Sequence, residues 1–139
     1  MVFVDIRTES RFPINRKKIK EIIDTVLKKH GIRGKVDVGI LVVGDRKMKE
    51  LNNKYIGHDE TTDVLSFPLE NGGVMSRRGT IDAPSGFISP PDGFLHLGDI
   101  VISYPRAILQ AQENNVLVDE EILFLIEHGL LHLLGIHHE

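Results

Sequence analysis

The spacing of apolar residues along the chain predicts strands and helices in alternation. Val2–Arg7 and Val36–Val43 have the alternating or continuous apolar pattern of strands that pack on a core. Between them, apolar residues recur at helical spacing from Asn15, a residue type that caps helices, to about Lys29. The Gly31 that follows is of the type that ends helices. The first part of the chain is therefore predicted to run strand, helix, strand.

The alternation continues through the middle of the chain, with one long interruption. A helix is predicted from a cap at Asp45 to about Tyr55, and a strand at Asp63–Phe67. Residues 70–96 are rich in Gly and Pro and show little periodicity, which predicts a long loop or flap. A fourth strand is predicted at Ile100–Ser103.

Two helices are predicted at the end of the chain. The first runs from about Pro105, which suits a first-turn position, to Asn114. The second is capped by Asp119 and ended by Gly135. Its apolar residues lie almost all round the helix, which predicts a central, buried element: Ile122, Leu123, Phe124, Leu125, Ile126, Leu130, Leu131, Leu133 and Leu134. The order of elements indicates an α+β fold of the α/β type, with a mixed sheet of about four strands packed against helices.

Composition narrows the class of protein. A chain of 139 residues with 41% apolar residues is expected to form one domain, spanning residues 1–139, with its own core. The absence of cysteine excludes disulfides and thiolate ligands. Neither a signal peptide nor a run of ~18 apolar residues is found, so we expect a cytoplasmic protein that does not enter a membrane.

The net charge of −3 is unevenly distributed along the chain. Residues 1–57 carry 14 Lys and Arg against 7 Asp and Glu, whereas residues 58–139 carry 3 against 13. A basic first half would attract a nucleic-acid backbone. The alternative is that these cations lie on solvated helix faces and serve solubility.

The strongest candidate chemistry is a set of three histidines at the C-terminal end, His128, His132 and His138. The four-residue spacing of the first pair puts both imidazoles on one helix face, and Gly135 can turn the chain so that the third returns toward them. A lone histidine in such a helix is usually a hydrogen-bonded core residue, but three in this pattern indicate a zinc-type ion, with nickel or another transition metal also possible. The open position would take a water, and beyond this metal-bound water no catalytic residue is identified. His137 or an acidic residue could instead supply a fourth ligand.

The histidine pair differs from that of the common zinc proteases. Gly129 stands where the His-Glu-x-x-His signature places its general base. Glu127 precedes His128 and is predicted to point elsewhere on the helix, as a surface or supporting group.

Three segments together resemble a known family. The run from His128 to His138 is similar to the His-Gly-x-Leu-His-Leu-x-Gly-[Tyr/Trp]-Asp-His signature of the YbeY-type rRNA maturation factors, a zincin-like group of metal-dependent endoribonucleases. Thr62–Pro68 and Leu97–Ser103 agree with it in order and spacing. The resemblance implies zinc bound by His128, His132 and His138. It also implies cleavage of single-stranded RNA, maturation of the 16S rRNA 3′ end, ribosome quality control, and contact with the small ribosomal subunit or its proteins.

The chain departs from the family pattern at several positions. Ile56 stands where the family usually has an Arg, so no catalytic arginine is carried over, and Arg77 or Arg78 is the alternative source of a cation. Thr61 replaces a Pro, and His137 replaces the Asp before the last ligand.

Three polar residues in the matching segments have two interpretations. Asp63, Ser66 and Asp99 belong to the segments that resemble the family, but each is more simply expected to satisfy backbone groups at a strand end.

Three functions are compatible with these observations. The favoured one is a zinc-dependent endoribonuclease acting on single-stranded RNA. The second is a metal-dependent peptidase or amidase, which the missing Glu at position 129 disfavours. The third is a ribosome-assembly factor without catalytic activity, in which zinc only stabilises the C-terminal turn.

Overall fold

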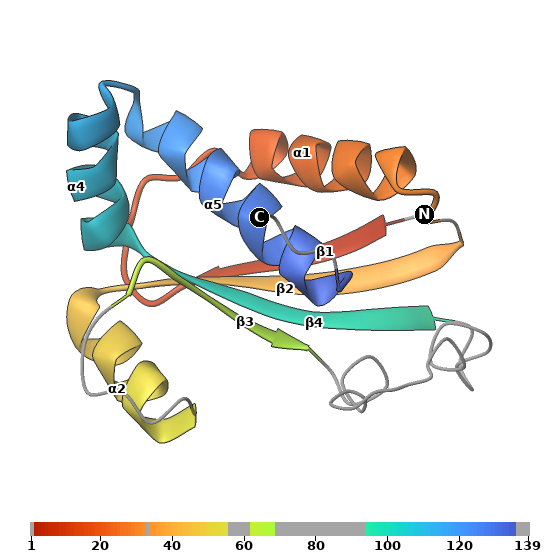
Figure 1. Cartoon of the computed structure of the whole chain (residues 1–139), viewed down its shortest axis with the longest axis horizontal. Helices are drawn as coiled ribbons and strands as arrows, with labels where there is room; N and C mark the ends of the chain where they lie inside the picture. The colour runs from red at the N-terminus through yellow and green to blue at the C-terminus, as the bar shows by residue number, and fades with distance from the viewer. Residues whose placement is uncertain (1, 33, 56–61, 69–93, 136–139) are drawn as a thin grey trace.

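The computed structural model describes residues 2–32, 34–55, 62–68 and 94–135 (Figure 1). Within these ranges the chain forms a mixed sheet with helices on both sides, which confirms the predicted fold class. The elements in chain order are β1 (Val2–Thr8), α1 (Arg16–Lys29), β2 (Lys35–Val43), α2 (Asp45–Tyr55), β3 (Val64–Pro68), β4 (Phe94–Ser103), α4 (Tyr104–Asn114) and α5 (Val118–Leu133).

The sheet has the strand order β1-β2-β4-β3. β2 pairs with β1 and with β4 in parallel, and β3 pairs with β4 antiparallel at the edge of the sheet. A β-bulge interrupts the β2–β4 pairing beside Asp37 and Val38, where Gly98 takes a φ of 129° that a residue with a side chain rarely adopts. The bulge divides β4 into two segments that would otherwise form one regular strand.

The two faces of the sheet carry different helices. α1 and α5 cover one face, and α2 lies against the other (Figure 1). The main core lies under α1 and α5 and contains buried residues of α1, β2, β4 and α5, among them Ile23, Leu27, Ile40, Ile100, Ile126 and Leu130. A much smaller cluster of Val43, Met48 and Val101 lies under α2.

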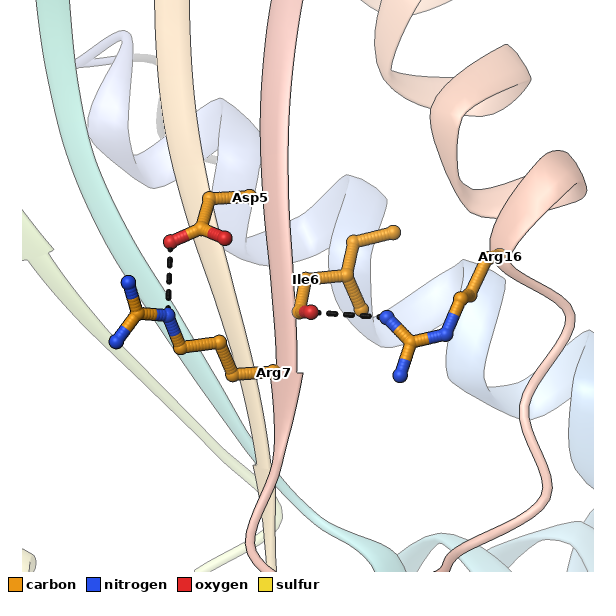
Figure 2. Close-up of polar contacts among 4 residues, drawn as sticks. All are labelled: Asp5, Ile6, Arg7 and Arg16. Atoms are coloured by element: carbon orange, nitrogen blue, oxygen red, sulfur yellow. Dashed lines mark hydrogen bonds and ion pairs between the residues drawn. The ribbon is translucent and has the colours of Figure 1, made fainter.

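Alternate residues of β1 face opposite sides of the sheet, and one side faces the start of α1. Asp5 and Arg7 point away from α1 and form an ion pair of 3.0 Å (Figure 2). On the other side of the strand, Arg16 donates a hydrogen bond of 2.8 Å to the carbonyl of Ile6 (Figure 2). Asn15 caps α1 as predicted, because its Oδ1 accepts from the backbone N–H of Lys18 at 3.0 Å.

Three predictions of element bounds or caps were wrong. Asp45 is the first residue of α2 and lies in its first turn, so it does not precede the helix as a cap. β4 begins at Phe94, so the predicted loop of residues 70–96 extends too far. Leu95 and Leu97 contribute to the core before the Gly98 bulge, and the nearby glycine hid this half of the strand. α5 begins at Val118, so Asp119 lies in its first turn and does not cap it. The carboxylate of Glu120 instead accepts from the N–H of Leu117 at 3.0 Å.

The last helix is less buried than its composition predicted. Its inner residues, such as Ile122, Ile126 and Leu130, have 2% exposure or less. Phe124, however, is 60% exposed, and His132 also lies on the outside. One face of the helix is therefore buried and the other is exposed, although apolar residues occur on both, because no described element covers the outer face.

Candidate metal centre on the last helix

The inner face of α5 approaches the sheet closely at Gly129. A Cβ at this position would lie 2.9 Å from Cγ2 of Ile100 on β4 and 3.1 Å from Oγ of Ser66 on β3. Ser66 Oγ donates a hydrogen bond of 3.2 Å to the Gly129 carbonyl. Gly129 lies between the two candidate ligands in sequence and allows α5 to lie directly on β3 and β4. The hydrogen bond from Ser66 ties α5 to the edge strand.

The outer face of the same turn carries two of the three predicted ligands. The ring centroids of His128 and His132 are 4.5 Å apart, and the ring planes are inclined at 46°. At this separation both imidazoles can reach one ion at the ~2.0–2.1 Å of a zinc–nitrogen bond. α5 thus brings this pair together as the four-residue spacing predicted.

The third predicted ligand, His138, and its neighbour His137 lie outside the described residues. The turn that leads to them is described as far as Gly135, which takes a φ of +80° just after the helix, as predicted. No group of three or more His, Cys, Asp or Glu that could bind a metal occurs in the described ranges. The three-histidine site remains a prediction of which the structure describes two members.

A hollow of about 360 Å³ adjoins His128 on the outer face of α5. Phe124, Glu127 and Leu131 line it together with His128. Glu127 and His128 are neighbouring helix positions about 100° apart, and both line this hollow, which is compatible with the predicted surface or supporting role of Glu127. Phe124 was expected in the core but is exposed, and no sequence signal separated it from the apolar residues of the inner face. Leu131 is buried in the core as expected and also borders the hollow.

The polar residues of the two other matching segments have separate positions. Asp63 accepts a hydrogen bond of 2.7 Å from Nε2 of Gln110 on α4, and its backbone carbonyl accepts from Ser103 N–H at 3.0 Å. Ser66 bonds to α5 as described above. Both side chains therefore have structural roles, but not the expected one at a strand end. Ser66 is the middle residue of β3 and bonds to the backbone of α5, and the Asp63 side chain, just before β3, bonds to a side chain of α4.

Asp99 lies on the opposite face of the sheet from α5. Its side chain covers Gly39 of β2, where a Cβ would collide with Oδ1 of Asp99. Partial burial raises the pKa of Asp99, the carboxylates of Asp5 and Asp37 raise this pKa further, and Arg7 opposes them. Nδ1 of His96 lies 2.7 Å from Oδ2 of Asp37 in the same cluster. This acidic group is separated from the histidine pair by the sheet.

The basic residues of the first half do not form one surface. The lysines of α1 lie on the α5 side of the sheet, and the cations of α2 lie on the other side (Figure 1). At the end of α2, Tyr55 is exposed and contacts Phe67 edge to face at 5.3 Å between ring centroids. Ile56, Thr61, Arg77 and Arg78 lie outside the described residues.

The mixed sheet and the histidine pair on the outer face of its last helix can now be compared with known proteins, which define the class as an enzyme that acts on RNA. Residues 5–139 match the family model described as endoribonuclease YbeY. A protein of that name from Dehalococcoides mccartyi is 43% identical over 122 residues, which cover 87% of this chain and 69% of the relative. A protein of the same name from Roseiflexus sp. (strain RS-1) is 40% identical over 121 residues, with the same coverage of 87% and 69%.

A solved structure has a similar fold. The solution structure of TM1509 from Thermotoga maritima matches with a TM-score of 0.58 and 28% identity, over 99% of this chain and 75% of that one. The chain therefore belongs to the endoribonuclease YbeY family. None of the helices in the described ranges is long and apolar enough to cross a membrane.

Proposed function

We propose that this protein is a zinc-dependent endoribonuclease that cuts single-stranded RNA at a site on the outer face of α5. Its membership of the endoribonuclease YbeY family supports an enzyme that acts on RNA. The observation that carries the location of the site is the pair of imidazole rings, His128 and His132, whose centroids lie 4.5 Å apart. His138 would complete the ligand set.

The donor set suits the proposed ion. Three neutral imidazoles are ligands that zinc accepts, and nickel or another transition ion would also fit them. When bound, such an ion supplies Lewis-acid chemistry, because it polarises a phosphoryl oxygen and makes water more acidic.

The role of the chain itself in this proposal is to orient the ligands. Gly129 lets α5 lie directly on β3 and β4, and Ser66 ties the Gly129 carbonyl to the edge strand. His128 and His132 project from the turn that is anchored in this way. Ligands on a rigid helix lose little entropy when they bind, which favours a well-ordered site.

The cellular role follows as the finer part of the proposal. We infer that the substrate is small-subunit rRNA, that the reaction matures the 16S rRNA 3′ end and serves ribosome quality control, and that the protein acts in the cytoplasm with the small subunit as its partner. The exposed lysines of α1, on the same side of the sheet as α5, would track the RNA backbone. The α2 cations lie on the wrong side for this purpose.

A peptidase is disfavoured by the same turn of α5. The position that holds the general base in His-Glu-x-x-His proteases is Gly129, and a side chain there would meet Ile100 and Ser66 on the sheet. A base at that position would have no room without movement of the helix.

The proposal is tested on the full chain purified without added metal. Metal content is measured by mass spectrometry, and cleavage is measured on a single-stranded RNA and on the same sequence in a duplex. We expect about one zinc-type ion per chain, cleavage of the single strand alone, loss of cleavage in chelator and recovery with zinc. Cleavage that persists at full rate after complete metal removal would contradict the proposal. A chain that binds rRNA and melts at a lower temperature in chelator, but cleaves nothing under any metal, would favour the assembly factor.

A further inference from the structure

The exposed aromatic ring of Phe124 lies next to the candidate ligands on the outer face of α5. Phe124 lies one helical turn before His128, and 60% of its surface is exposed. Its ring centroid is 6.4 Å from that of His128, with only 21° between the ring planes, and His128 is followed by His132 at 4.5 Å. The outer face of α5 therefore presents three flat rings at four-residue intervals, of which the first is an apolar phenyl ring.

The hollow beside these rings has a suitable size and composition for one flat group. Its volume of about 360 Å³ is at the lower end of the ~300–1,000 Å³ typical of small-molecule sites. One wall is the Phe124 ring, another is the aliphatic side chain of Leu131, and Glu127 contributes a carboxylate. His128 is the fourth described residue that lines the hollow, so a group held here would lie directly beside the proposed metal site.

We propose that this hollow binds one nucleobase of a single-stranded RNA, stacked on Phe124, next to the phosphodiester that is cut. The inference rests on the proposed function, and it adds a binding residue and a base preference to it. Unpaired bases are characteristically held by stacking on aromatic side chains, because every base offers a π-face. A duplex keeps its bases stacked on one another, so this hollow also explains a preference for single strands.

Glu127 gives the hollow a preference among bases. A carboxylate accepts hydrogen bonds and donates none, so it favours an amino group on the base edge. Adenine, cytosine and guanine carry such a group, whereas uracil has no amino group and its one ring N–H on this edge lies between two carbonyl oxygens that the carboxylate repels. The preference against uracil at one position of the substrate is therefore assigned to Glu127.

The first test compares variants of the full chain in RNA affinity. Binding of a fluorescently labelled single-stranded oligonucleotide is measured by anisotropy in chelator, and KM and kcat are measured with zinc present. Phe124→Ala is expected to weaken binding about tenfold and to raise KM similarly, with kcat nearly unchanged. Phe124→Trp restores binding, and Phe124→Leu does not. Leu109→Ala is the matched control, since Leu109 is an exposed apolar residue of α4 that does not line the hollow.

The second test locates the base. A series of oligonucleotides, each with one abasic nucleotide at a different position, is bound to the unaltered protein and to Phe124→Ala. At one position the two proteins are expected to bind the oligonucleotide with equal affinity. The base that would stack is missing there, so loss of the Phe124 ring has no further effect. At that same position, uracil is expected to weaken binding to the unaltered protein, and Glu127→Gln to abolish this discrimination.

The outcomes separate this inference from the function on which it depends. If the unaltered protein binds and cuts RNA but Phe124→Ala has the same affinity and KM, the base-binding hollow is refuted and the endoribonuclease proposal stands. The same holds if the Phe124→Ala defect persists at every abasic position, since the ring would then act only by packing against His128. If the unaltered protein neither binds nor cuts RNA, both proposals fail together.

Discussion

The inner and outer faces of α5 both carry large apolar residues, but they differ in what surrounds them. On the inner face, Ile126 and Leu130 are fully buried, and Gly129 is in close approach to Ile100 and Ser66. On the outer face, Phe124 is largely exposed and His128 and His132 present their rings side by side. Apolarity alone does not assign a residue to a face, because the exposed Phe124 is apolar like the buried Ile126 and Leu130.

We therefore expect the inner face of α5 to determine stability and the outer face to determine ligand binding. A close-packed contact tolerates little change in volume, so inner-face substitutions act on the free energy of unfolding. Outer-face substitutions remove side chains that no described element covers, so they are expected to change ligand binding with little effect on folding. Three predictions test this separation, and a fourth concerns the far face of the sheet, which α5 does not contact.

The largest effect is expected for His132→Ala on the outer face. Loss of one of two imidazoles that share an ion should abolish stoichiometric metal binding and lower the rate of RNA cleavage by at least about 100-fold. The far-ultraviolet circular dichroism of the metal-free protein should be unchanged, because His132 is exposed. His30→Ala is the matched control, since His30 is an exposed histidine at the end of α1. Equal metal content in the two variants would show that His132 is not a ligand.

The largest effect on stability is expected for Gly129→Ala on the inner face. The added Cβ would lie 2.9 Å from Cγ2 of Ile100, so α5 or β4 must shift. We expect the free energy of unfolding in urea to fall by about 1–3 kcal/mol. At Gly44 a Cβ would make only ordinary contacts, the nearest of 3.6 Å with Glu9, so Gly44→Ala is the matched control. Equal losses in both variants would remove the close approach as the cause.

A smaller loss is expected for Ser66→Ala, which removes the hydrogen bond of 3.2 Å from β3 to the Gly129 carbonyl. The free energy of unfolding should fall by about 0.5–1.5 kcal/mol, the net value of one such bond. Because this bond anchors the turn that carries the histidines, metal affinity should fall slightly as well. Affinity titrations on Ser66→Ala and on Ser10→Ala, an exposed position outside the site, measure this coupling. Unchanged affinity would confine Ser66 to a role in stability.

The smallest effect is expected on the far face of the sheet, for Asp99→Asn. Partial burial, with Asp5 and Asp37, raises the pKa of Asp99 in the folded protein above its unfolded value of ~3.9. The unfolded chain therefore releases this proton at lower pH, and stability is lost as pH rises through the folded pKa. Removing the charge should raise stability near pH 7 by a few tenths of a kcal/mol after solvent screening, and the gain should vanish below about pH 4. Thermal melts from pH 3 to pH 7 measure it, and a less stable variant at pH 7 would contradict the sign.

Much of the fold followed from local patterns. The apolar spacing of α1 and its cap at Asn15 were predicted because both depend on neighbouring residues alone. The start of β4 was missed because Gly98, at the bulge, resembled a loop residue, and only pairing with β2 makes that segment a strand. The start of α5 was missed because a carboxylate in the first turn and a capping carboxylate look alike in sequence.

The candidate site divides in the same way between sequence and tertiary structure. The sequence by itself determined that His128 and His132 share a helix face and that Gly135 follows as a turn, because helical periodicity and glycine's backbone freedom are local properties. Tertiary structure decided which side of an apolar helix meets the sheet. It therefore also decided that Phe124 and Glu127 line a hollow beside His128, that Gly129 and Ser66 anchor the turn, and that Asp99 lies on the far face. The physical reason is that burial depends on which elements pack together over long distances in the chain, and residues of equal hydropathy do not encode that choice one by one.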